Sequence, residues 1–193
     1  LPGYSGSVIF SRPSLQASQP IPYDTLQLAQ ACDLLLSNAD DLSAVDTYQF
    51  DVVHLIRQVL GDLAQTMYLD VVDAYTAQDR EALRLAGQRY LELMHDLDRL
   101  LGTRREFLLG TWLRDAKRWA TADDERRLLE WNARNLITLW GPRDSILHEY
   151  AYRQWSGLIR GFYLKRWALF VDRLAGSLET GQAFDAAEFE RVE

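Results

Sequence analysis

Two neighbouring stretches of the sequence place apolar side chains at alternating steps of three and four residues. The first runs from about residue 44 to 76 and the second from about 79 to 101. This spacing puts the apolar side chains on one face of an α-helix, and that face must be buried against another element. Because only Ala77 and Gln78 separate the stretches, we expect an antiparallel helical hairpin. The repeating residues are Val52, Ile56, Val59, Leu60, Leu63, Met67, Val71 and Tyr75, then Leu83, Ala86, Tyr90, Leu93, Met94, Leu97 and Leu101.

The rest of the chain also favours helices. They are expected at about residues 23–38, 109–120, 122–139 and 148–176. Residues 1–22 differ, because they hold four of the five prolines, and we expect an extended segment lying across the helices. No stretch alternates apolar and polar residues for long enough to predict a strand. The sequence therefore predicts an all-α fold, a bundle of long antiparallel amphipathic helices with an extended N-terminal segment.

Size and charge limit the classes of protein. A chain of 193 residues that is 48% hydrophobic suits one domain, with residues 1–22 extended and 23–193 helical. A net charge of −7 opposes binding to nucleic acid or to an anionic membrane, and we expect neither partner. No apolar run of 18 residues and no targeting segment is found, so either the protein is cytosolic or its targeting segment lies outside this chain. The single cysteine, Cys32, lies in an apolar run and is interpreted as a buried, unreactive thiol.

Two acid-x-x-His patterns are the best candidates for a metal site. They are Asp51 with His54 and Glu92 with His95, and paired patterns of this kind on facing helices can hold two metal ions. In the expected hairpin they are offset by more than one helical turn, and both histidines lie on polar faces. We therefore interpret both as solvated surface residues and expect no metal or cofactor. The sequence contains no nucleophile motif and no phosphate-binding glycine loop, so it gives no catalytic residue.

The most unusual stretch is Thr138–Trp155, "TLWGPRDSILHEYAYRQW", where one predicted helix stops and the next begins. Gly141 is expected to supply the backbone angles that end the first helix at Trp140, and Pro142 prevents its continuation. We expect Trp140 and the residues through His148 to project from the surface of the domain. The alternative is that Trp140 packs into the hydrophobic core, as a tryptophan at a helix end ordinarily does.

The residues around this break resemble a known family. Together with "RPSLQ" at 12–16, "DVVHLIRQVL" at 51–60 and "REFLLGTWLRDAK" at 105–117, they are similar to the C-terminal all-helical domain of the α-N-acetylglucosaminidase family, glycoside hydrolase family 89. Enzymes of this family combine a small N-terminal domain, a (β/α)8 barrel with two catalytic glutamates, and this helical domain packed on the barrel. The resemblance implies part of an exo-acting, retaining glycosidase that releases terminal α-linked N-acetylglucosamine, lysosomal in animals and mostly exported in bacteria.

The resemblance also implies which residues bind substrate. The family counterpart of Trp140 lines the sugar pocket, where an indole face can pack on the C–H face of a pyranose. Tyr150 corresponds to a pocket tyrosine, with Tyr152 as the alternative if the alignment is shifted. Ile146 or Leu147 corresponds to an aliphatic pocket residue. The catalytic residues would lie in the barrel of the same polypeptide, so this chain alone is expected to be inactive.

Several nearby residues are interpreted as structural. Arg134 is interpreted as a structural residue, either an ion pair or a clamp on the carbonyls of a neighbouring loop. Packing residues, in the bundle interior or against the barrel, are expected to be Trp131, Trp155, Phe162 and Trp167. A different class of function also stays open at this point: a free-standing helical module that binds protein partners through the aromatic patch.

Overall fold

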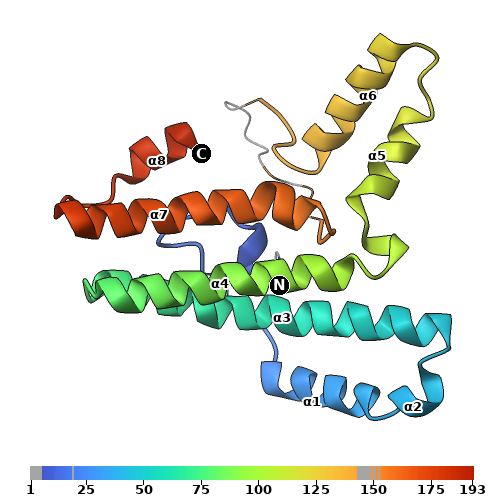
Figure 1. Ribbon diagram of the computed structural model, residues 1–193, viewed down its shortest axis with the longest axis horizontal. Coiled ribbons are helices and arrows are strands. Elements are labelled where there is room, and N and C mark those ends of the chain that lie inside the picture. Colours follow the sequence, from blue (N-terminus) through green and yellow to red (C-terminus); the bar gives the residue numbers. More distant parts are fainter. Residues whose placement is uncertain (1–5, 19, 143–148, 150, 152) are drawn as a thin grey trace.

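A central helical hairpin organises the molecule, whose computed structural model describes residues 6–18, 20–142, 149, 151 and 153–193. Helices α3 (Asp46–Thr76) and α4 (Arg80–Leu101) lie side by side and antiparallel (Figure 1), which confirms the predicted hairpin. The turn between them ends at Asp79, whose side chain accepts a hydrogen bond from the Ala82 N–H at 3.0 Å. This N-cap starts α4 at the predicted place.

The other helices pack around this hairpin (Figure 1). Helix α7 lies along α4, and α1 lies along α3. Helices α5 and α6 form a second, shorter hairpin that extends from one end of the bundle, and α8 lies beside α7. The described residues form no β-strand, and the predicted all-α class is confirmed. The remaining bounds are η1 Val8–Phe10, α1 Thr25–Leu36, α2 Ala39–Leu42, η2 Arg105–Phe107, α5 Leu109–Lys117, α6 Asp123–Leu136, η3 Ile159–Tyr163, α7 Leu164–Thr180 and α8 Ala186–Val192.

The two helices of the hairpin differ in how well their buried faces were predicted. In α4 the predicted stripe is buried almost completely. In α3 the predicted stripe is mostly half-buried, and the buried face contains small or polar residues such as Gly61, Ala64 and Gln65. The reason is that α3 is covered by α1 and η1 as well as by α4. Close approach of η1 requires a small residue, because a Cβ on Gly61 would lie only 3.2 Å from the Ser7 Cβ.

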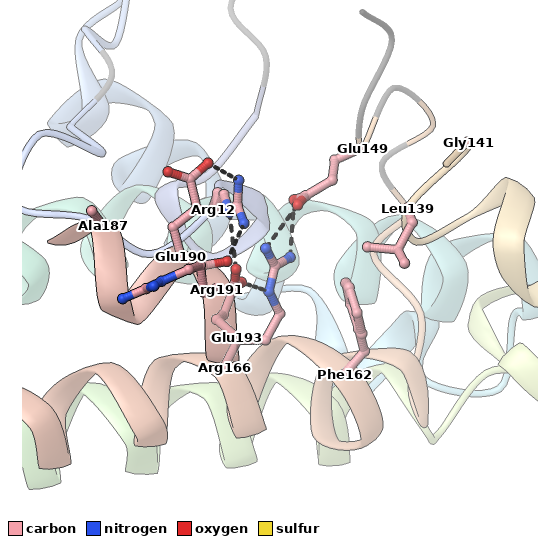
Figure 2. Close-up of a pocket in the computed structure, with 10 residues that line it drawn as sticks. All are labelled: Arg12, Leu139, Gly141, Glu149, Phe162, Arg166, Ala187, Glu190, Arg191 and Glu193. Atoms are coloured by element: carbon pink, nitrogen blue, oxygen red, sulfur yellow. Dashed lines mark hydrogen bonds and ion pairs between the residues drawn. The ribbon is translucent and has the colours of Figure 1, made fainter. Parts of the chain in front are cut away.

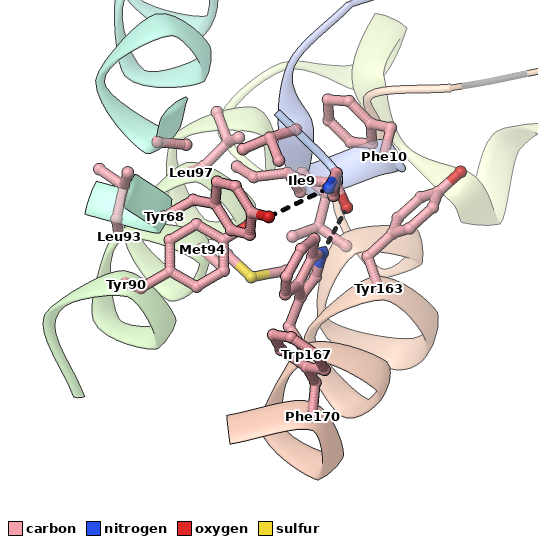
Figure 3. Close-up of a cluster of buried hydrophobic side chains, with 14 of the residues drawn as sticks. Ile9, Phe10, Tyr68, Tyr90, Leu93, Met94, Leu97, Tyr163, Trp167 and Phe170 are labelled. Atoms are coloured by element: carbon pink, nitrogen blue, oxygen red, sulfur yellow. Dashed lines mark hydrogen bonds between the residues drawn. The ribbon is translucent and has the colours of Figure 1, made fainter. Parts of the chain in front are cut away.

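The N-terminal segment enters the core more deeply than a segment lying across the helices would. The three residues of η1 are at most 1% exposed. Trp167 of α7 donates its indole N–H to the Ile9 carbonyl at 2.9 Å (Figure 3). Tyr68 of α3 accepts a hydrogen bond from the Ala17 N–H at 3.0 Å. These bonds satisfy the polar groups of a segment that packs against both α3 and α7.

The predicted helix over residues 148–176 is wrong at both ends. The chain is not helical at residues 153–155, and the helix begins with the π-helical turn η3, runs on as α7 and ends at Thr180. Two features delay its start. Gly157 has a positive φ of 87°, and Asp98 of α4 accepts hydrogen bonds from the backbone N–H groups of Gly157 at 2.7 Å and Arg160 at 3.1 Å. A side chain from another helix therefore caps this one.

Two further expectations concern the single cysteine and membrane-spanning helices. Cys32 on α1 is buried, as expected, and desolvation raises the pKa of its thiol. Within the part of the chain that the structure describes, no helix combines the length and the apolar character needed to cross a lipid bilayer.

Candidate functional site

The turn that ends α6 is built around the backbone of Trp140. Helix α6 stops at Leu136, earlier than the predicted end at residue 139. Asn135 then holds the turn from two sides. Its carbonyl accepts the Trp140 N–H at 2.7 Å, and its side-chain amide donates to the Trp140 carbonyl at 3.2 Å. The peptide groups on both sides of the indole are thereby fixed relative to α6.

The backbone of Trp140 adopts an unfavourable conformation. Its φ is +68°, and the Gly141 N–H donates to the Leu139 carbonyl at 2.8 Å, so Trp140 is the central residue of a γ-turn. The expectation that Gly141 supplies the unusual angles is wrong, because the positive φ is at the tryptophan. A left-handed conformation costs an L-residue about 1–2 kcal/mol, and it is rare for a bulky side chain. Strain of this kind is concentrated at functional sites.

Glu149 joins the far end of the following segment to the same turn. Its N–H donates to the Leu139 carbonyl at 3.2 Å, so this one carbonyl accepts hydrogen bonds from both Gly141 and Glu149. Glu149 also has a positive φ, of 53°. The two ends of the segment between Leu139 and Glu149 are therefore held together.

Arg166 of α7 fixes the side chain of Glu149 (Figure 2). Its two terminal nitrogens donate to the two carboxylate oxygens of Glu149, at 2.7 and 2.9 Å. Its Nε donates to Glu193, and the guanidinium lies over the ring of Phe162, 4.8 Å from the ring centroid. Burial alone would lower the pKa of Arg166, but the hydrogen bonds that it donates to Glu149 and Glu193 outweigh burial and raise that pKa. The arginine therefore stays charged in a buried position.

A second arginine extends this ion pair into a cluster. Arg12, from the N-terminal segment, binds Glu193 at 2.9 Å and Glu190 at 2.7 Å. We call these five side chains the ionic cluster: Arg12, Glu149, Arg166, Glu190 and Glu193. The cluster connects the N-terminal segment, the turn after α6, α7 and α8.

A cavity of about 410 Å³ lies between the ionic cluster and the turn. Leu139, Gly141 and Phe162 provide its apolar side (Figure 2). The carboxylates that line it are bound to arginines, so they are occupied in structural ion pairs and are poor candidates for general acid–base catalysis. Among the described residues no group of three or more side chains is arranged to hold a metal ion. Among the described residues the carboxylates of this site are therefore held in ion pairs, and the turn that carries Trp140 forms part of the cavity wall.

Of the predicted substrate-binding residues, the structure describes only Trp140. Its side chain is half-buried. The other predicted pocket residues, Ile146, Leu147 and Tyr150, and the alternative Tyr152, lie outside the described residues.

Sequence reasoning missed the supports of the turn, Glu149 and Arg166. A signal for Arg166 was present, because it occupies an apolar face of α7 four residues after Phe162 and four before Phe170. A charge in such a position requires a buried partner. Nothing in the sequence identified Glu149 as that partner.

The residues interpreted as structural divide into two groups. Trp167 is fully buried, while Trp155 and Phe162 are half-buried. Trp131 is 62% exposed on α6, so it does not pack in the bundle interior. Arg134 forms an ion pair with Glu130 at 2.6 Å, one of the two structural roles expected for it.

The two histidines of the acid-x-x-His patterns have exposed side chains, as expected. His54 lies 3.1 Å from a guanidinium nitrogen of Arg57, a cationic neighbour that does not favour a metal site.

Comparison with known proteins places these features in a family. The family model of the alpha-N-acetylglucosaminidase (NAGLU) C-terminal domain matches residues 2–192. Human alpha-N-acetylglucosaminidase is 34% identical over 190 residues, which are 98% of this chain and 25% of the human protein. The chain therefore belongs to the family of alpha-N-acetylglucosaminidase C-terminal domains.

Solved structures agree with this assignment. A family 89 glycoside hydrolase from Clostridium perfringens in complex with PUGNAc superimposes with a TM-score of 0.90, at 31% identity, over 96% of this chain and 23% of that one. An enzyme from the same bacterium in complex with its substrate GlcNAc-alpha-1,4-galactose gives a TM-score of 0.89 at 32% identity, over 97% of this chain and 23% of that one. The chain thus spans about a quarter of the length of the relatives that it matches.

Proposed function

We propose that this chain is the helical C-terminal domain of an exo-acting, retaining alpha-N-acetylglucosaminidase. In this proposal it packs on a (β/α)8 catalytic barrel of the same polypeptide and completes the pocket for a terminal α-linked N-acetylglucosamine. The observation that carries the proposal is the match over nearly the whole chain to enzymes four times its length. The two catalytic carboxylates of the reaction would lie in the barrel.

Trp140 is the residue of the described part that we propose contacts the sugar. Three features support this role. Hydrogen bonds fix the backbone of Trp140, the residue is half-buried, and the backbone keeps a strained conformation that a glycine would adopt more easily. An indole face positioned in this way can pack on a pyranose and leave the polar hydroxyls to other groups. Ile146, Leu147 and Tyr150 remain proposed pocket residues on the resemblance alone.

The hairpin of α5 and α6 is the surface that we propose packs on the barrel. It carries large apolar side chains that the domain itself leaves uncovered, namely Trp119, Leu128 and Trp131. Trp119 is 82% exposed. An apolar surface of this kind is typical of a contact with another domain. Trp131, predicted as a packing residue, would then pack in the interface between domains.

The experiment measures hydrolysis of a chromogenic α-N-acetylglucosaminide by the full-length protein that contains this chain. The full-length protein should be active, and Trp140→Ala should lower kcat/KM by about tenfold or more, because contacts to the transition state are lost. Trp119→Ala tests the proposed surface and should weaken association of the separately produced parts. Lack of activity on this substrate class would contradict the proposed reaction.

The chain Leu1–Glu193 on its own should not hydrolyse the substrate faster than buffer. Activity that survives purification and disappears when an acidic residue of this chain is replaced would place the catalytic residues here. We also propose an exported or lysosomal compartment, on the resemblance alone; secretion of the full-length protein from its own host would test it.

A further inference from the structure

We propose that Arg166 is a positioning residue, which sets the orientation of Trp140 through Glu149. This inference rests on the proposed sugar contact of Trp140. It assigns a role in substrate binding to an ion pair on α7 that touches neither the sugar nor the reacting atoms.

The connection runs through described atoms at every step. The guanidinium of Arg166 holds both carboxylate oxygens of Glu149. The backbone N–H of Glu149 donates to the Leu139 carbonyl, which also accepts the N–H of Gly141 and so closes the γ-turn around Trp140. A shift of Glu149 would therefore pull on the carbonyl that defines the conformation of Trp140.

The geometry at Arg166 suits positioning. Two parallel hydrogen bonds to one carboxylate fix its orientation as well as its distance. The side chains of Arg166 and Glu149 are only 8% and 13% exposed, so water does not loosen the pair. Phe162 supports the guanidinium from one face, and it belongs to the π-helical turn η3. Turns of this type are frequent at functional sites.

Glu193 provides a matched comparison. It is bound to the same guanidinium, through Nε, and its side chain is 3% exposed. It follows α8, and its carboxylate accepts hydrogen bonds from Arg12 and Arg166. Loss of the Glu193 charge removes one ion pair of Arg166 and leaves the pair with Glu149 in place.

The test uses the full-length protein and the chromogenic α-N-acetylglucosaminide. Glu149→Gln keeps the shape of the side chain and removes its charge. Arg166→Lys keeps the charge and removes the paired hydrogen bonds. Each should lower kcat/KM by about tenfold to a hundredfold, the range that follows from displacing a positioned group by about 1 Å. Glu193→Gln should lower the melting temperature about as much as Glu149→Gln does. It should change kcat/KM by less than about threefold.

The discriminating measurement combines Glu149→Gln with Trp140→Ala in one protein. If Arg166 and Glu149 act by orienting the indole, Glu149→Gln should cause almost no further loss of kcat/KM once the indole is absent. If the kcat/KM losses of Glu149→Gln and Trp140→Ala multiply in the double variant, the inference is overturned. A kcat/KM loss in Glu193→Gln as large as that in Glu149→Gln would also overturn it. An unchanged kcat/KM in Trp140→Ala would overturn the proposed sugar contact itself. A loss in Trp140→Ala without one in Glu149→Gln would overturn the positioning role alone.

Discussion

The strained backbone of Trp140 leads to an unusual prediction: glycine should be more stable than alanine at this position. In Trp140→Ala the indole is lost and the φ of +68° stays unfavourable. In Trp140→Gly the same ring is lost and the backbone strain disappears, because glycine adopts a positive φ readily. A comparison of the two variants therefore separates the cost of the backbone from the contribution of the ring.

The magnitudes follow from the turn. Full burial of a large apolar side chain contributes about 1.5–3 kcal/mol, so the half-buried indole should contribute about 1–1.5 kcal/mol. Replacing the L-residue at this positive φ by glycine removes a strain of about 1–2 kcal/mol. The greater freedom of glycine in the unfolded chain costs about 0.4–1 kcal/mol. Mid-range values, about 1.5 less about 0.7 kcal/mol, make Trp140→Gly more stable than Trp140→Ala by about 0.8 kcal/mol, or roughly 2–3 °C in melting temperature for a domain of this size.

Thermal melts of the chain Leu1–Glu193 check this order, with Leu139 as the control position. Leu139 is in the same turn and does not have a positive φ, so there Ala should be more stable than Gly by about 0.4–1 kcal/mol. In the full-length protein both Trp140 variants should lose kcat/KM equally, since both lack the ring. A Trp140→Ala variant as stable as Trp140→Gly, or more stable, would refute the strain at this residue.

Three further predictions concern the bundle. Gly87→Ala should destabilise the chain by about 1–3 kcal/mol in urea titrations, because its Cβ would lie 2.5 Å from Val171 Cγ1, and adding Val171→Ala should restore stability. Trp167→Leu should cost about 3 kcal/mol in thermal melts, because it removes buried ring atoms and the hydrogen bond to Ile9. Desolvation and the charge of Arg57 lower the pKa of His54 below 6.5. His54 therefore binds fewer protons in the folded chain than in the unfolded chain. Its contribution to the free energy of unfolding should be fully present above pH 6.5 and should be lost as the pH falls through the lowered pKa. His54→Gln should flatten that slope, and NMR titration checks the pKa.

The buried residues could be predicted for a helix that buries only one face. In α4 the apolar spacing from Leu83 to Leu101 marks the buried face, because that face meets α3 and α7. In α3 the same reasoning was less successful, since a helix covered on several sides buries Gly61, Ala64 and Gln65 as well. The late start of the last helix depends on Asp98, a residue on α4. Spacing within one segment cannot reveal a cap that comes from another helix.

The candidate site shows the same limit. The break at "WGP" and the aromatic ring beside it could be predicted from local residues. The assignment of the unusual φ to Gly141 was the natural choice from sequence, because glycine has the lowest cost there. The structure has the positive φ at Trp140, because hydrogen bonds from Asn135, Gly141 and Glu149 hold that turn. The bond from Asn135 comes from its side chain, and Glu149 lies ten residues after Leu139, so spacing alone does not reveal either bond. The ionic cluster, which joins residues as far apart as Arg12 and Glu193, depends entirely on the tertiary fold.

The location of the strain bears on what the indole contacts. Among the described residues the non-glycine positions with positive φ are Gln78, Trp140 and Glu149. Gln78 lies in the tight turn of the central hairpin, where a left-handed residue is needed to reverse the chain. The other two flank one segment, whose ends the Leu139 carbonyl joins. At Trp140 the domain holds a bulky ring in a conformation that costs about 1–2 kcal/mol, yet it covers that ring only in part. Because Trp140 is only partly buried within the domain, part of its surface remains accessible to a sugar or to the barrel. On this argument kcat/KM of the full-length protein should depend on Trp140 more strongly than the stability of the domain does.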